Sequence, residues 1–152
     1  RSAELISEMT KVKTEKSRMD AAANAVSRHG EAINKRDIDS YLATTNFPFT
    51  YQNYDGVALT VEAKERYTGD GLWPWEIILQ GNSNWHYTRF DTVEEVARSL
   101  SSAVFKITLS RIDRAGHDYG TYEAIWIVTN QNGHWGVQFR HNLGLVTEEH
   151  SA

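Results

Sequence analysis

The stretch GHWGVQFRHNLG, residues 133–144, alternates apolar and polar side chains, which is typical of a β-strand. Its odd positions are mostly apolar and include Trp135, Val137, Phe139 and Leu143. Its even positions carry side chains that can donate hydrogen bonds, namely Gln138, Arg140 and Asn142. Ordinary alternation turns such a polar face to bulk water. A strand can also turn it into a polar cavity, and the two arrangements predict different functions.

The composition describes an ordinary globular domain. The chain has 152 residues, of which 40% are hydrophobic and 24% charged, enough to bury one sizeable core. The formal net charge of −4 and the scattered basic residues do not favour a nucleic-acid partner. No apolar run approaches the roughly 18 residues that a membrane-spanning helix needs. We therefore expect neither nucleic acid nor membrane as a partner.

Cysteine is absent, which excludes disulfides, a thiol nucleophile and cysteine-ligated metal sites. That absence fits a cytoplasmic protein, which is our expectation for localisation, although a start at Arg1 leaves a removed leader open. We expect one domain over residues 17–146, preceded by an extension over residues 1–16 and followed by a tail over residues 147–152.

The first half of the chain is predicted to begin with helices. From Met19, apolar residues recur at helical spacing, although Gly30 weakens this helix. RDIDSYLATTN, residues 36–46, predicts a second, short helix capped by Asp37. Thr60 is expected to cap a third helix in VEAKERYTGDG, residues 61–71. LWPWEIILQGN, residues 72–82, is too short to assign, although Pro74 suits a helix N-terminus.

The remaining pattern predicts strands. Residues 46–61 are aromatic and β-branched, and Asp55-Gly56 marks a hairpin turn within them. Four long runs follow at about residues 84–98, 103–114, 119–130 and 134–143, with turns between them. Helices followed by an antiparallel meander predict an α+β domain whose helices pack on one face of a curved sheet.

Three segments carry a resemblance to a known family: NWHYTRFDTVEEV, GTYEAIWIVTNQNGHWGV and QFRHNLG. They are similar to the SnoaL-like family of bacterial proteins, within the nuclear-transport-factor-2-like (NTF2-like) or cystatin-like superfamily. The resemblance covers about residues 20–145. It implies an α+β cone, in which a curved antiparallel sheet wraps around three or four helices and encloses a pocket.

The resemblance also implies which face of the last strand lines that pocket. Gln138, Arg140 and Asn142 would point into it, so the polar face would belong to a ligand site rather than to bulk water. The opposite face, with Trp135, Val137 and Phe139, would be covered by a second subunit in a homodimer. A β-bulge would exchange the two faces, because a slip of one residue inverts every side chain.

The candidate acid–base residues follow from this arrangement. Glu123 lies in mid-strand among apolar neighbours, where an isolated charge is costly, so we expect a buried pair with Arg140. Either Glu123 or His86 would act as the base, and Arg140 would stabilise an oxyanion. Substrate-binding positions would be Tyr51, Asn53, Gln138 and Asn142. His29, near the core stripe of the first helix, is interpreted as structural.

Three functions stay open from the sequence. The first is cofactor-independent proton transfer, namely isomerisation, dehydration or cyclisation of a hydrophobic carbonyl-containing substrate. The second is a non-catalytic module that binds a small hydrophobic, carboxylate or carbonyl ligand in the same fold. The third is epoxide hydrolysis, because Tyr51 and Asn53 resemble the Tyr-x-Asn pair of the limonene epoxide hydrolases, which share this fold. The other parts of that active site do not match: Arg111 and Asp113 are expected at the sheet rim, and Arg140 replaces a carboxylate. We expect no metal and no organic cofactor.

Overall fold

The computed structural model describes residues 21–67 and 73–146. The expected extension over residues 1–16 and the tail over residues 147–152 lie outside the described residues, so that division of the chain stays a prediction. Within the described ranges, no helix is long and apolar enough to cross a membrane.

The described chain begins with helices and ends with a meander of long strands. A first helix over residues 21–35 precedes α2 (Ile38–Ala43), β1 (Thr45–Asn53) and β2 (Ala58–Val61). A 3-10 turn (Lys64–Arg66) and helix α3 (Pro74–Gly81) follow. The four last strands are β3 (Trp85–Arg98), β4 (Ser102–Asp113), β5 (Asp118–Gln131) and β6 (His134–Leu145). These four strands match the predicted runs to within two residues.

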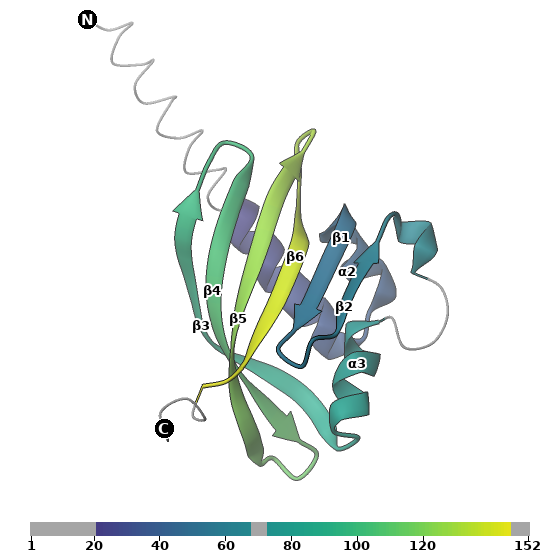
Figure 1. Cartoon of the computed structure of the whole chain (residues 1–152), viewed down its shortest axis with the longest axis vertical. Helices are drawn as coiled ribbons and strands as arrows, with labels where there is room; N and C mark the ends of the chain where they lie inside the picture. The colour runs from purple at the N-terminus through teal and green to yellow at the C-terminus, as the bar shows by residue number, and fades with distance from the viewer. Residues whose placement is uncertain (1–20, 68–72, 147–152) are drawn as a thin grey trace, which may run out of the picture.

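All six strands form one sheet in the order β2-β1-β6-β5-β4-β3. Neighbours are antiparallel except β1 and β6, which are parallel. In Figure 1 the long strands β3–β6 curve around the first helix, which crosses behind them, and α3 lies near the lower ends of β1 and β2. The predicted α+β class, with helices on one face of a curved sheet, is confirmed.

Local sequence signals explain the first elements. Asp37 caps α2 by accepting a hydrogen bond from the Ser40 N–H, as predicted. The Asp55-Gly56 turn joins β1 to β2, and Gly56 has a positive φ of 91° that favours glycine. Gly30 is required by packing, because an added Cβ would lie 2.8 Å from the ring of Phe90. The helix therefore tolerates a poor helix former in order to approach the sheet closely.

The helix predicted after Thr60 is wrong. Thr60 and Val61 belong to β2, where Val61 pairs with Phe49, and a short 3-10 turn is the one helical element that the structure describes between β2 and residue 67. Pairing with β1 and burial of Val61 in the core outweigh the capping signal. The ambiguous segment after it does form a helix, α3, with Pro74 in its first turn.

A bulge in β6 redistributes the faces of the last strand. Between Ile127 and Val128, the partner in β6 changes from Phe139 to Val137, so Gln138 is the extra residue. Val137 is consequently fully buried in the core, and Trp135 also packs against it. The prediction that Val137 and Trp135 lie on the outer face is wrong, because the bulge turns this end of the strand over.

Candidate functional site

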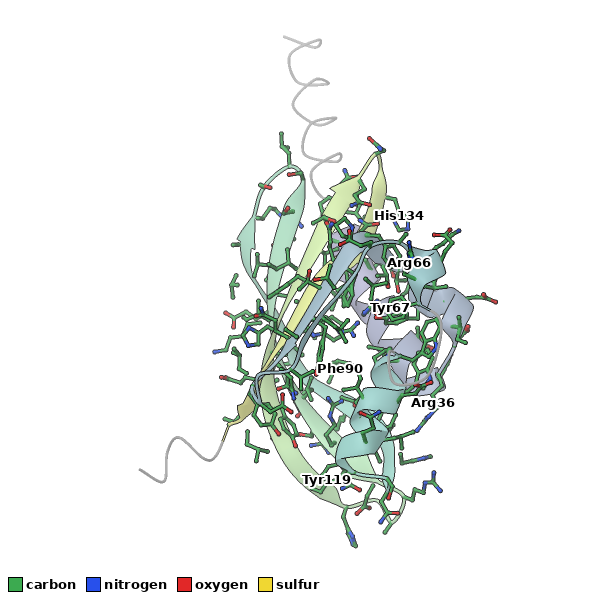
Figure 2. All side chains as sticks on the ribbon, turned by 45° about the vertical axis from the view of Figure 1, so that its right-hand side comes forward. Arg36, Arg66, Tyr67, Phe90, Tyr119 and His134 are labelled. Atoms are coloured by element: carbon green, nitrogen blue, oxygen red, sulfur yellow. The ribbon has the colours of Figure 1, made fainter. Side chains whose placement is uncertain are left out.

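The concave side of the sheet encloses two adjoining chambers beneath helix α3. The inner chamber leaves about 50 Å³ of free space, and the outer chamber about 240 Å³. Five residues line both, namely Tyr51, Ile77, Ile78, Arg111 and Asn142. In Figure 2, Phe90 of the inner wall lies between the sheet and the helices, and Tyr119 of the outer wall lies toward the lower end of the long strands.

The walls of the two chambers differ in chemistry. The inner chamber is mostly apolar, with Ile33, Phe90, Leu109, Ala124 and Trp126 among its lining residues. The outer chamber adds hydroxyl and amide groups, from Asn53, Tyr54, Asn82, Tyr119 and Tyr122. A ligand in this space would therefore meet an apolar interior and a polar entrance.

Arg140 lies in the interior, on the face that the family resemblance assigns to the pocket. Its register partner in β5 is Trp126, which is buried, and the Arg140 side chain is 5% exposed. One guanidinium nitrogen, Nη1, donates to His29 Nε2 at 2.5 Å and to the Tyr41 hydroxyl at 3.0 Å. The guanidinium carbon also lies 4.7 Å from the ring centre of Phe49. These contacts fix the guanidinium in place within the inner wall.

His29 has one protonation state that fits these contacts. Arginine only donates hydrogen bonds, so Nε2 of His29 accepts and the proton lies on Nδ1, 3.0 Å from the Thr44 hydroxyl oxygen. Burial and the adjacent Arg140 charge hold the pKa of His29 well below its usual value. The ring is thus neutral, and its lone pair is used by Arg140. The structural interpretation of His29 agrees with this geometry.

Arg111 has a much poorer set of partners. Its Nη1 donates to the Thr88 hydroxyl at 2.5 Å, and its guanidinium carbon lies 5.7 Å from the Tyr122 ring centre. No carboxylate among the described residues forms an ion pair with it. Burial lowers the pKa of Arg111, which expresses the cost of an unpaired cation there, but arginine stays charged at neutral pH. Arg111 lies two residues before the end of β4, as expected near the rim of the sheet, and its side chain lines both chambers.

Tyr51, Asn53 and Asn142 line the pocket as the sequence predicts. Burial raises the pKa of Tyr51, which keeps its hydroxyl protonated and able to donate. Gln138 does not line either chamber. Its amide accepts from the Thr129 hydroxyl at 2.8 Å and donates to the Pro48 carbonyl at 3.0 Å, because the bulge turns it toward β1.

Glu123 and His86 lie outside both chambers. Glu123 alternates with Ala124 and Trp126, which are buried, and it pairs with Lys106 at 3.5 Å on the outer face. The predicted Glu123–Arg140 pair is wrong, because the register places Gly144 opposite Glu123 and the two side chains belong to opposite faces. His86 is exposed, and its ring contacts that of Tyr87.

Sequence reasoning missed Arg111 and the two isoleucines of α3. The signal for Arg111 is in the alternation of β4, where Phe105, Ile107 and Leu109 are buried and Arg111 continues the same face. The proximity of the following turn obscured it. Within the described ranges, no group of three or more His, Cys, Asp or Glu residues is placed to hold a metal ion.

Comparisons with known proteins agree on the fold. No protein-family model matches this sequence, and no curated protein matches it. Among solved structures, an NTF2-like protein with a cystatin-like fold from Novosphingobium aromaticivorans is similar with a TM-score of 0.65 and 10% identity, over 97% of this chain and 94% of that one.

Two further structures have the same degree of similarity. A candidate dehydratase of the NTF2-like family from Streptomyces avermitilis has a TM-score of 0.65 and 12% identity, over 88% of this chain and 99% of that one. An NTF2-like protein of unknown function from Pseudomonas putida has a TM-score of 0.62 and 17% identity, over 92% of this chain and 93% of that one. These identities support a shared fold and nothing finer. The chain has the cystatin-like, NTF2-like fold that its last strands imply.

Proposed function

We propose that this protein binds a small organic anion, with the anionic group held by Arg111 and a flat apolar body between α3 and the sheet. The observation that carries the proposal is the state of Arg111. It lies where the two chambers meet, with one hydrogen bond to Thr88 and no carboxylate partner among the described residues. Arg111 is half-buried, and a partly desolvated cation without a counter-ion is unfavourable; an anionic ligand would supply that counter-ion.

The charge of the pocket supports the same ligand. Arg111 and Arg140 both line the inner chamber, and no Asp or Glu occurs among the described residues that line either chamber. Burial lowers the pKa of Arg111, and repulsion by the nearby Arg140 charge lowers it further. A carboxylate is the group that matches a guanidinium by charge and by two-pronged geometry.

The apolar walls support a flat hydrophobic body attached to that anion. Ile77 and Ile78 of α3 face the tyrosines of the outer chamber, and Phe90 and Trp126 close the inner one. Aromatic and aliphatic side chains of this kind favour a ring over a flexible polar chain. A single-ring aromatic acid is the simplest compound with both features.

Proton transfer of the SnoaL-like kind is the second candidate function. It is favoured by the structural similarity to the candidate dehydratase from Streptomyces avermitilis. In this alternative, Arg111 and Arg140 would stabilise an oxyanion and the Tyr51 hydroxyl would donate a hydrogen bond to it. The described lining contains no carboxylate or histidine to act as a base, so binding without catalysis is the function that the geometry supports best.

A comparison of a charged and a neutral ligand tests the proposal. Benzoate should raise the melting temperature more than benzamide at the same concentration and ionic strength, and Arg111→Gln should remove the difference. Arg114→Gln is the matched control, because Arg114 is exposed in the turn after β4. Equal shifts with benzoate and benzamide, or an unchanged benzoate effect in Arg111→Gln, would contradict the proposal.

We also propose that the protein forms a homodimer through the outer face of the sheet. Phe139 lies opposite Ile127, and His141 opposite Ile125, and none of the four is fully buried by its own chain. Trp135 no longer belongs to this surface, because it packs against the core. Sedimentation of a species of monomer mass at micromolar concentration would contradict the dimer.

A further inference from the structure

We infer that the anion bound by this protein also carries an amide group, which Asn53 and Asn142 recognise at the entrance of the pocket. The inference rests on the proposed function and specifies the ligand further. It follows from the unequal hydrogen bonding of these two asparagines. Both line the outer chamber together with Arg111.

The two asparagines are neighbours across two strands. Asn53 ends β1, Asn142 lies in β6, and they are register partners in the parallel β1–β6 pair. Side chains of register partners project from the same face of a sheet. A single ligand group can therefore contact both amides.

Asn142 offers a donor to the pocket. Its Oδ1 accepts the Gly144 backbone N–H at 3.0 Å, and this bond orients the amide. No described residue accepts a hydrogen bond from its Nδ2, and that NH2 group can therefore donate to a ligand. The positive φ of Gly144, 107°, allows the chain to turn back and form this contact.

Asn53 offers the complementary acceptor. Its Oδ1 is the one buried side-chain oxygen or nitrogen without a hydrogen-bond partner among the residues that the structure describes. A buried acceptor without a donor is unfavourable, and such groups in proteins commonly find a partner in a ligand or in water. Asn53 itself lines the outer chamber, so a ligand there lies beside this amide.

An acceptor beside a donor matches an amide, whose N–H would donate to Asn53 and whose C=O would accept from Asn142. Arg111 opens on the same chamber, so the carboxylate must lie within a few bonds of the amide. N-acyl amino acids with an aromatic acyl group carry a ring, an amide and a carboxylate within a few bonds of one another. Hippurate, N-benzoylglycine, is the simplest probe of the class.

Three carboxylates of equal length test the inference by calorimetric titration. Hippurate carries the amide, 4-oxo-4-phenylbutanoate replaces its N–H by CH2, and 4-phenylbutanoate lacks both polar groups. We expect hippurate to bind about tenfold more tightly than 4-oxo-4-phenylbutanoate, the effect of one hydrogen bond at a buried acceptor. Asn53→Leu should abolish this preference without weakening 4-phenylbutanoate, whereas Asn84→Leu, an exposed asparagine outside both chambers, should preserve it.

The outcomes separate the inference from the function on which it rests. If the three carboxylates bind equally tightly and none of them binds to Arg111→Gln, amide recognition is overturned. The proposal of an anion site at Arg111 then stands. Binding that does not depend on Arg111 would overturn both. If Asn53→Leu fails to fold, the preference for hippurate over 4-oxo-4-phenylbutanoate in the wild-type protein decides the inference alone.

Discussion

Two arginines point into the same cavity and have opposite surroundings. Arg140 donates from Nη1 to His29 and Tyr41 and lies against the Phe49 ring, so three neighbouring side chains hold it in place. Among the residues that the structure describes, Arg111 has one hydrogen bond, to Thr88, and it lines both chambers. Burial of a charge therefore does not by itself identify a ligand site. The number of its protein partners separates a charge held by the fold from one that is open to a ligand.

Replacement of Arg140 should cause the largest change in the free energy of unfolding. Arg140→Ala should lower the free energy of unfolding by about 3–5 kcal/mol, because it leaves a cavity and removes the donor to His29 and Tyr41. Arg140→Lys should also destabilise, because an ammonium cannot reproduce the planar donors of a guanidinium. Urea denaturation measures both. A loss below about 1 kcal/mol for Arg140→Ala would place Arg140 in the same class as Arg111.

The next effect is a loss of stability in acid. The folded-state pKa of His29 is lowered below that of the unfolded chain, so the unfolded state binds the extra proton first. Stability from this group is complete above about pH 6.5 and falls as the pH decreases below it, by at most about 1.4 kcal/mol per pH unit. Urea midpoints between pH 5 and 7.5 test this. The slope should persist in the control His86→Gln, whose ring is exposed, and diminish in His29→Gln; an identical slope in His29→Gln would contradict the assignment.

Replacement of Arg111 should change the free energy of unfolding in the opposite direction to replacement of Arg140. Without ligand, Arg111→Met should raise the free energy of unfolding by up to about 1 kcal/mol, because it removes a half-buried charge that has no counter-ion among the described residues and keeps most of the side-chain volume. The same variant should lose the response to benzoate. Destabilisation comparable to that of Arg140→Ala in thermal or urea unfolding would erase the contrast between the two residues.

The smallest expected effect concerns Glu123. Its partner is Lys106, at 3.5 Å on the outer face, and both side chains are partly exposed. Glu123→Gln should therefore change stability by no more than about 0.5 kcal/mol, measured by urea denaturation beside Lys106→Gln. A loss of several kcal/mol would restore Glu123 as a buried partner and refute the strand register.

The sequence was most informative where one local pattern dominates. The alternation and turns of the last four strands predicted β3–β6, and Asp37 and Asp55-Gly56 predicted a cap and a hairpin. It was least informative where tertiary pairing decides. Val61 joined a strand because Phe49 pairs with it, and the bulge at Gln138 divided one polar face between the pocket and β1.

The sequence predicted several residues that line the pocket, but it did not predict their hydrogen-bond partners. The family resemblance placed Arg140 and Asn142 inside, but one partner of Arg140, His29, comes from the first helix, which is 111 residues away in the chain. Counting from a turn predicts partners only between neighbouring strands, and it cannot predict a contact with a distant helix. Arg111 was within reach of the same alternation argument, and its interior position depended only on continuing the apolar face of β4 by one more residue.

In the proposed function, Arg111 rather than Arg140 binds the anion. Nuclear magnetic resonance of the arginine Nε–Hε groups during titration with benzoate tests it directly, with signals assigned through Arg111→Lys and Arg140→Lys. We predict that the Arg111 signal shifts most, saturates with benzoate and does not move with benzamide. A titration in which the Arg111 signal stays fixed, while benzoate binds or while only exposed arginines respond, would contradict the claim.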